Sequence, residues 1–541
     1  MTDLHHSLAL LQGSTPLAPL HDLDVEPGEQ QRALLARILT HILGGQSPTL
    51  APGAAGTGKT TMIRLLLRLL LAAGLRVVVA TPTHKARTRV EETLGDLGVE
   101  VVTHHSLWCG GAVEEIEEGE EYADDLHLSP AETPRDHPYD VVVVDEASML
   151  TASDLDNLTE CLREDCVIVG TGDHHQLPPV GGPAGFDWRG ADDYGLTKVY
   201  RQEGGSPVLD AATAIREQGV PFTFSKVANF GAGDRILKAA GVPVRWTDPN
   251  EVGYQLALAI KEHGGGLSSA VAVCGTHQSR VLVTDATRFH LGLPRRREGP
   301  AIGERVIARA SGGGLTNSTQ GTVMAVSAQD FGGRFGSGWI VHLDTEHGQR
   351  RVVGVLEQSW LQTDRTKHRG LVPYSIRQMI QTYSEEDVAE NEAEIAMQML
   401  SRTRAYLAKR PGTNSVPEWL TARWRGELCA LLGAWGPWLQ AHLAALDSAY
   451  AITCHASQGS QWQEVFVVAD CVDFVGRSHE DSQQIDPTQV YRWSYTAITR
   501  AVERAVVVKK SRGHWDEPAP LTDVEIGTAS RDWQAKRSNR R

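Results

Sequence analysis

The sequence predicts an α/β protein with two parallel-sheet halves and further segments inserted into them. Three short apolar runs, at residues 76–80, 141–144 and 167–170, are separated by stretches of helical periodicity. Strands that are apolar throughout are typical of a parallel sheet covered by helices on both faces. The pattern resumes after residue 196 and indicates a second sheet. Its strands are predicted at 270–274, 450–453, 465–469 and 505–509.

The remaining periodic segments predict helices and an inserted β region. Apolar residues at helical spacing predict helices at 29–43, 59–73 and 279–291. Gly-rich short strands interrupt the second half and indicate a small barrel or meander. They lie at 305–308, 322–326, 339–343 and 351–355. Helical patterns follow at 385–409 and 417–446. An acidic stretch at 105–139 interrupts the first half and is typical of a solvated arm.

The overall composition fits several folded domains whose surface is not predominantly positive. The chain has 541 residues, which is too long for a single core and suits three or four domains. Because the formal net charge is −15, any contact with nucleic acid must use a local groove. The seven cysteines are dispersed, and neither a signal peptide nor a membrane-length apolar run is evident. We therefore expect reduced thiols, a cytoplasmic location and no membrane contact.

A glycine-rich loop, GAAGTGKTT, opens the predicted helix at 59–73 and fits the pattern G-x-x-x-x-G-K-[ST]. Glycines let backbone amides turn toward phosphate oxygens, where a Cβ would crowd them. Lys59 would place its charge against the β- and γ-phosphates, and the Thr60 hydroxyl is a ligand for Mg²⁺. The positive end of the following helix adds to this field. The predicted nucleotide-binding residues are Gly53, Ala54, Ala55, Gly56, Thr57, Gly58, Lys59, Thr60 and Thr61.

Two adjacent acids, Asp145 and Glu146, end the apolar strand at 141–144. Acids at the end of a buried strand are costly without a cation, so Asp145 is predicted to hold Mg²⁺. Glu146 is predicted to orient and deprotonate the attacking water. Such pairs also occur by chance, and the glycine-rich loop makes this one significant.

Three further polar residues are predicted to act on the transferring phosphoryl group. Gln176 in GDHHQLPPV is a candidate sensor of the γ-phosphate or the attacking water, although the segment also fits a proline-stiffened surface loop. Arg201 in VYRQ and Arg500 in TAITRA are candidates for charge stabilisation. For either arginine, ordinary surface exposure is the alternative.

Taken in order, these blocks resemble the superfamily 1 helicases, and within them the B branch typified by RecD and by phage Dda-like helicases. The resemblance extends from about residue 25 to 510. It rests on EQQRA, GAAGTGKTT, TPTHKA, THHS, DEASM, GDHHQLPPV, VYRQ, ITCHASQGS and YTAITRA.

The resemblance implies two RecA-like P-loop motor domains, with an inserted pin subdomain and an inserted small β-barrel plus a helical, tower-like extension. A turn that is usually Asn-Gly in the family barrel is Asn317-Ser318 here. The implied boundaries are a lead at 1–24, a first motor at 25–195 with the pin at 107–139, a second motor at 196–300 and 448–515, the inserted region at 301–447 and a tail at 516–541.

Further site residues are implied only by this resemblance. Gln30 would read the adenine edge, and Gly459 would join the ATP site. Side chains at strand ends would contact single-stranded DNA, although short polar residues there are equally typical of helix caps. These are Thr81, Pro82, His84, Thr103 and His105 in the first motor, and Thr453, His455 and Ser457 in the second.

The implied activity is that of a monomeric, Mg²⁺- and ATP-dependent DNA helicase that moves 5′→3′ on single-stranded DNA and unwinds duplex DNA. It would act in replication, recombination or repair in a bacterial or phage-infected cell. A replication protein or a single-strand-binding protein is a candidate partner. Three alternatives stay open: an RNA-directed helicase, a motor subunit of a recombination nuclease complex, and a non-unwinding ATP-switched binding module.

Overall fold

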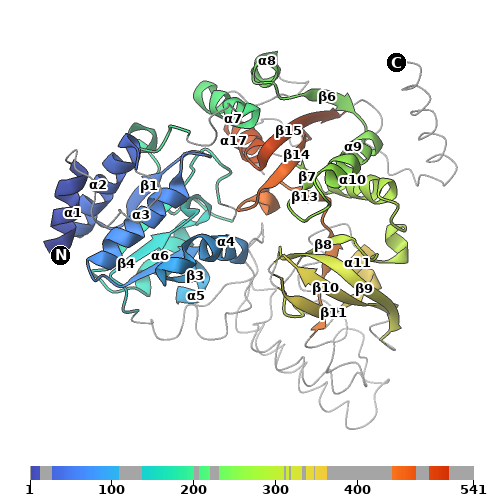
Figure 1. Cartoon of the computed structure of the whole chain (residues 1–541), viewed down its shortest axis with the longest axis horizontal. Helices are drawn as coiled ribbons and strands as arrows, with labels where there is room; N and C mark the ends of the chain where they lie inside the picture. The colour runs from blue at the N-terminus through green and yellow to red at the C-terminus, as the bar shows by residue number, and fades with distance from the viewer. Residues whose placement is uncertain are drawn as a thin grey trace, which may run out of the picture.

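The computed structural model of the chain contains three five-stranded sheets (Figure 1). Four predicted segments lie wholly or mostly outside the described residues: the acidic stretch, the helical patterns at 385–409 and 417–446, and the tail at 516–541. The described residues are 2–12, 27–108, 137–179, 181–199, 206–219, 231–309, 312–315, 318–331, 337–346, 348–361, 442–470 and 487–510.

The first sheet is parallel, with strand order β1-β5-β4-β2-β3. Its residues alternate between two cores, because Val77 and Val79 pack with helices on one face while Val78 and Ala80 pack on the other. The predicted strands are confirmed to within two residues, whereas β1 and β3 were not predicted. The strands are β1 Thr49–Pro52, β2 Val77–Thr81, β3 Glu100–Thr103, β4 Val141–Val144 and β5 Val167–Gly172.

Helices cover both faces of this sheet. One face carries α1 Thr2–Gln12, α2 Glu29–Leu43 and α3 Lys59–Ala72, and the other carries α5 His104–Trp108 and α6 Ala152–Glu160. A further helix, α4 His84–Leu94, follows β2. Residues 2–12 were expected to belong to a polar lead. They instead form α1, whose Leu4 and Leu11 are buried in the first core.

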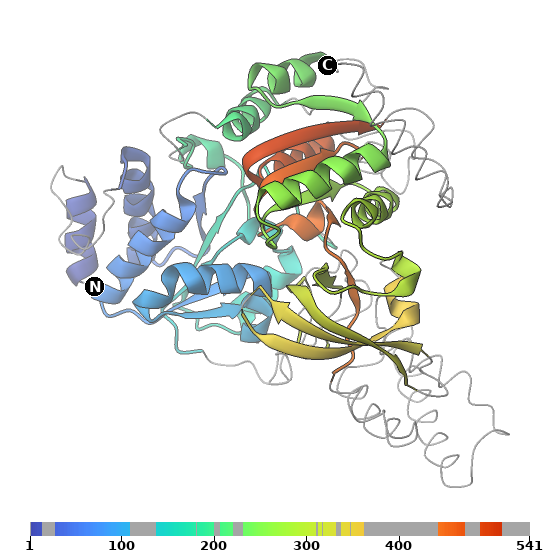
Figure 2. The same cartoon turned by 45° about the vertical axis from the view of Figure 1, so that its right-hand side comes forward.

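The second sheet is also parallel, with order β13-β7-β14-β15-β6. Its strands are β6 Val244–Thr247, β7 Ala270–Cys274, β13 Ala451–Thr453, β14 Trp462–Val468 and β15 Ala501–Lys510. Helices α7 Pro207–Gln218, α8 Gly231–Ala239 and α17 Pro487–Ile498 pack on one face. Helices α9 Pro249–Glu262 and α10 His277–His290 cover the other (Figure 2). The four strands predicted for this half are confirmed, and β6 was not predicted.

The third sheet is antiparallel, with order β11-β10-β9-β8-β12. The segment before β12 joins its two edges, since Leu443 forms a bridge with Gly354 of β11 while β12 pairs with β8. Leu446 was expected to end a helix and instead begins β12. Ser318, at the position where the family usually has glycine, has a φ of 68°, in the left-handed region that favours glycine. The elements are β8 Arg305–Ala308, β9 Gln320–Asp330, β10 Ser337–Thr345, β11 Arg350–Leu356, β12 Leu446–Ser448 and α11 Glu357–Leu361.

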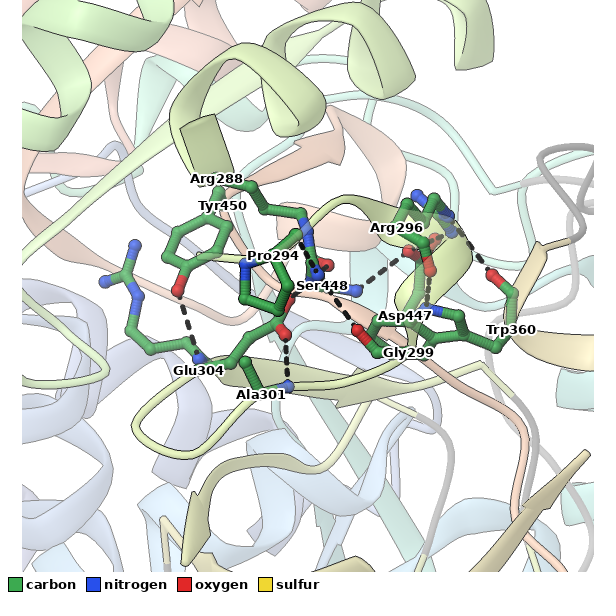
Figure 3. Close-up of polar contacts among 11 residues, drawn as sticks. Arg288, Pro294, Arg296, Gly299, Ala301, Glu304, Trp360, Asp447, Ser448 and Tyr450 are labelled. Atoms are coloured by element: carbon green, nitrogen blue, oxygen red, sulfur yellow. Dashed lines mark hydrogen bonds and ion pairs between the residues drawn. The ribbon is translucent and has the colours of Figure 1, made fainter. Parts of the chain in front are cut away.

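A buried group of ion pairs joins the third sheet to the second (Figure 3). Arg280 of α10 and Arg296 both contact Asp447 of β12. Arg288 of α10 contacts Glu304, and both carboxylates in this cluster are fully buried. Both stretches of chain that connect the two sheets pass through the cluster. Because buried charges are costly unless they are paired, the cluster holds the sheets together only while it is complete.

Among the described residues, no helix is long and apolar enough to span a bilayer. The cysteines in these ranges are buried and form no disulfide; they are Cys161, Cys166, Cys274 and Cys454.

Removing the shared carboxylate tests this junction. Asp447→Asn removes the carboxylate charge that the buried Arg280 and Arg296 contact, so we expect it to cost about 3–5 kcal/mol of stability in a urea titration followed by circular dichroism. Asp187→Asn is the control, because Asp187 pairs with Arg189 on the surface and its loss should have little effect. Equal effects of the two substitutions would contradict the structural role of the cluster.

Candidate nucleotide and nucleic-acid site

The glycine-rich loop lies between β1 and α3, at the carboxyl edge of the first sheet. Gly56 and Gly58 have φ angles of 77° and 80°, which other residues adopt only with strain. A Cβ on Gly53 would lie 2.8 Å from Lys59 Cγ. Lys59 Nζ donates to the carbonyl oxygens of Gly53 and Ala54, at 2.8 and 3.1 Å. The loop is therefore compact, with its lysine folded across its first residues.

The acidic pair follows β4, and β5 lies between that strand and β1. Asp145 Oδ1 accepts a hydrogen bond from the Thr171 hydroxyl of β5 at 2.8 Å. Burial and the adjacent Glu146 charge raise the pKa of Asp145. Glu146 itself has a φ of 53°, and such backbone strain in a non-glycine residue is concentrated at functional sites.

The donor chemistry at this edge fits a magnesium ion. Asp145 supplies a carboxylate whose charge the folded protein disfavours unless a cation is present. Thr60 supplies an exposed hydroxyl on the first turn of α3. Carboxylate and hydroxyl oxygens, completed by water and phosphate oxygens, are the usual ligands of Mg²⁺ beside a nucleotide.

Helix α17 and the turn after it pack on the second sheet and dock onto the loop that follows β5. We call the first and second sheets, each with its helices, the first and second motor, after the domains that the resemblance implies. The two segments are far apart in sequence, yet a row of four hydrogen bonds joins them. The pairs are Tyr491 with His175 (2.8 Å), Tyr495 with Asp173 (2.8 Å), Thr496 with the Leu177 amide (2.9 Å) and Arg500 with Gln176 (3.0 Å). Two residues predicted from separate motifs, Gln176 and Arg500, are thus brought into direct contact.

Arg500 is 4% exposed, lies in the turn between α17 and β15, and is held by the end of α17 as well as by Gln176. Its Nε donates to the Thr496 carbonyl at 3.0 Å. Burial lowers the pKa of Arg500, and the charge of Glu146 opposes this shift. The guanidinium therefore lies within electrostatic range of the predicted general base. Arg201 lies outside the described residues.

Gln30 and Gly459, which were predicted to join the ATP site, lie against residues outside the phosphate loop. The Gln30 side chain donates to the Thr197 hydroxyl at 2.9 Å and accepts from the amides of Thr197 and Lys198. The Gln30 side chain would have to break some of these hydrogen bonds in order to form new ones with an adenine base. Gly459 has a φ of 71°, and a Cβ there would lie 3.8 Å from Thr83 Oγ1 of the first motor.

The predicted DNA-contacting threonines of the first motor are buried. Thr81 and Thr103 face each other in β2 and β3. Thr81 donates to the Thr83 carbonyl, and Thr103 accepts from the Ser106 amide. Pro82 is buried, His105 is half-buried, and the His84 side chain lies outside the described residues. Both hydroxyls are therefore engaged in local hydrogen bonds, that of Thr103 as a cap, and contact with a ligand through them would require rearrangement.

The predicted DNA-contacting hydroxyls of the second motor are likewise engaged in local hydrogen bonds. Thr453 accepts from the Ala456 amide at 3.4 Å, and Ser457 donates to the Cys454 carbonyl at 2.5 Å. Both hydroxyl residues are buried, whereas His455 is half-buried. These contacts again fit caps at the end of a strand.

Four residues of the site were not predicted from the sequence. Gln31 is 4% exposed and donates to the Gly58 carbonyl of the phosphate loop at 3.3 Å. Thr171 holds Asp145, and Asp173 with Tyr495 links the two motors. Asp173 and Tyr495 lie inside recognisable motifs, but no local pattern indicates that they meet.

Comparison with known proteins places this geometry in a family. An AAA domain model matches residues 27–239, and a UvrD-like helicase C-terminal domain model matches residues 448–508. The two matched segments include the first sheet with its phosphate loop and the α17 region that docks onto it. Both matches agree with the resemblance to the superfamily 1 helicases. The resemblance to the RecD-like and Dda-like branch is confirmed, and the two parallel sheets form the RecA-like fold of this superfamily.

Several relatives align with this chain over part of their own length. The ATP-dependent RecD2 DNA helicase of Deinococcus radiodurans is 29% identical over 265 residues, which are 49% of this chain and 32% of that protein. The RecBCD enzyme subunit RecD of Mycolicibacterium smegmatis is 27% identical, over 60% of this chain and 59% of that protein. The ATP-dependent DNA helicase dda of Enterobacteria phage T4 is 28% identical, over 30% and 36%.

The chain thus spans less than two thirds of each of these relatives. A solved structure, the Pif1 helicase from Candida albicans, aligns over 95% of this chain and 100% of that chain, with a TM-score of 0.43 and 14% identity.

The raised pKa of Asp145 predicts a pH-dependent effect on stability. A carboxyl group whose folded-state pKa is raised favours folding when protonated, and this contribution is lost as the pH rises through that pKa. Asp145→Asn cannot ionise, so without Mg²⁺ and nucleotide it should melt at a higher temperature than the wild type at pH 8. The gain should shrink as the pH falls toward the ordinary carboxyl value of about 4.

Thermal melts at several pH values measure this effect, and Asp156→Asn, on the exposed face of α6, is the control. A melting temperature of Asp145→Asn at or below that of the wild type at pH 8 would show that the Asp145 charge is not disfavoured.

Proposed function

We propose that this protein is an ATP-dependent DNA helicase that translocates 5′→3′ on single-stranded DNA and unwinds duplex DNA. The contact of Arg500 with Gln176 carries the proposal, because it places a cation of the second motor at the nucleotide edge of the first. A site that only binds nucleotide does not need such an arrangement. The matched relatives named as DNA helicases support the choice of DNA, and the RecD-like resemblance supports the direction.

Each residue of the nucleotide edge has a role in this reaction. The loop amides and Lys59 bind the β- and γ-phosphates of ATP. Thr60 and Asp145 would hold Mg²⁺, whose charge offsets that of the phosphates. Glu146 orients and deprotonates the attacking water. Arg500, with Arg201 as a second candidate, stabilises the charge that develops on the transferring group, while Gln176 senses the γ-phosphate.

Movement along DNA follows from a site shared by two motors. Closure on ATP brings Arg500 toward the loop, and hydrolysis releases it, so the two strand-end blocks grip DNA alternately. Because the threonines at 81, 103 and 453 are engaged as caps, we assign their part to the strand ends that they hold in shape, with backbone amides and half-buried His105 and His455 contacting phosphates. The 107–139 segment is proposed as the pin, and the third sheet as the family's small barrel.

A motor subunit of a larger recombination nuclease is the second candidate function. The Mycolicibacterium smegmatis relative, which covers 60% of this chain, is named a RecBCD enzyme subunit. In this case the isolated chain would hydrolyse ATP on DNA without separating strands.

Unwinding of short duplexes with a single 5′ or 3′ tail tests the proposal. We expect ATP-dependent strand separation of the 5′-tailed substrate, and no separation by Lys59→Ala, because the phosphates lose their lysine. Oligonucleotide binding should survive in this variant. Preference for the 3′ tail, stronger stimulation of ATPase activity by RNA than by DNA, or unwinding by Lys59→Ala would each contradict part of the assignment.

A further inference from the structure

Tyr495 of α17 takes part in the interface between the motors, but the reaction described above gives it no role. Its side chain is 1% exposed. The phenol oxygen accepts a hydrogen bond from the Ala55 amide of the phosphate loop at 3.0 Å and donates to Asp173 Oδ2 at 2.8 Å. A single hydroxyl therefore joins the phosphate loop, the loop after β5 and the second motor.

The direction of these hydrogen bonds is fixed by their chemistry. A backbone N–H can only donate and a carboxylate accepts, so the hydroxyl accepts from Ala55 and donates to Asp173. Burial and the Asp173 charge hold the pKa of Tyr495 well above its usual range, so the phenol keeps its proton.

These hydrogen bonds continue from Tyr495 to Arg500, and we call the whole chain of bonds the relay. Asp173 is fully buried and also accepts from the Gln176 side chain at 3.4 Å. The Gln176 oxygen in turn accepts from Arg500 at 3.0 Å. A connected path thus runs from an amide of the phosphate loop to Arg500.

We propose that Tyr495 is a positioning residue that transmits occupancy of the phosphate loop to the second motor, and so couples ATP binding to the grip on single-stranded DNA. The inference rests on the proposed function. Amides of such a loop are the donors that a phosphate takes, so a bound phosphate competes with Tyr495 for the Ala55 N–H. Loss of this donor frees the Tyr495 hydroxyl from the loop, so that α17, and Arg500 with it, can shift toward the bound phosphate.

The same helix face provides a matched control. Tyr491 lies one turn before Tyr495, and its hydroxyl bonds His175 at 2.8 Å. This contact also crosses between the motors, but it involves no residue of the phosphate loop. Tyr495→Phe and Tyr491→Phe therefore each remove one interdomain hydroxyl and keep the ring, and only the first breaks the relay.

The decisive measurement is the coupling between two ligands. The affinity for a fluorescent oligo-dT is measured with and without a non-hydrolysable ATP analogue and Mg²⁺, and the affinity for the analogue with and without oligo-dT. Each ligand should change the other's affinity by the same factor, because linkage is reciprocal. For Tyr495→Phe we expect this factor to fall at least about fivefold toward one, while each ligand alone binds within about threefold of the wild-type affinity.

A second variant tests the path itself. Asp173→Asn interrupts the same relay, so adding it to Tyr495→Phe should reduce the coupling factor little further. Wild-type coupling in Tyr495→Phe, or equal loss in Tyr491→Phe, would overturn the inference. So would a collapse of both single-ligand affinities, which would mean that the hydroxyl only supports the fold. If the wild type binds neither ligand, the proposed function fails and the inference fails with it.

Discussion

The docking of α17 onto the loop after β5 is the contact on which the proposed ATP-driven mechanism depends. It places Arg500 against Gln176 and Tyr495 against Asp173, and it is the reason that two separate sheets contribute to one site. Each parallel sheet alone has only an edge of polar residues at the ends of its strands. The contact brings these two edges together, because side chains of the second motor bond polar side chains that follow β5 of the first.

The packing of the two motors and of the third sheet holds the elements that make this contact in place. The first motor is closely packed behind its loop, since helices cover both faces of its sheet and its strands are buried. The buried cluster around Asp447 and Glu304 joins the third sheet to the second motor. A charged junction of this kind specifies one arrangement of the two sheets, because any misfit leaves an arginine or a carboxylate buried and unpaired.

The sequence predicted those parts of the site in which chemistry depends on local residue order. The glycines, Lys59 and the Asp145–Glu146 pair are typical of a nucleotide site when they occur together at the ends of strands. The sequence could not predict that Tyr495 meets Asp173, because the two are 322 positions apart and their pairing depends on how the motors dock. Nor could it separate caps from ligand contacts at Thr81 or Thr103, since the same hydroxyl is suited to both. Helix α1 was missed because its leucines stand among polar residues and are buried only through packing against α2 and α3.

The ATPase rate of Arg500→Ala tests most directly whether the second motor completes the nucleotide site of the first. We predict a fall of about 10³-fold or more in DNA-stimulated turnover, with an affinity for a non-hydrolysable ATP analogue close to that of the wild type. Arg504→Ala, on the surface of β15, should hydrolyse ATP normally. Turnover by Arg500→Ala at the wild-type rate would contradict the claim, because the first motor would then be sufficient by itself.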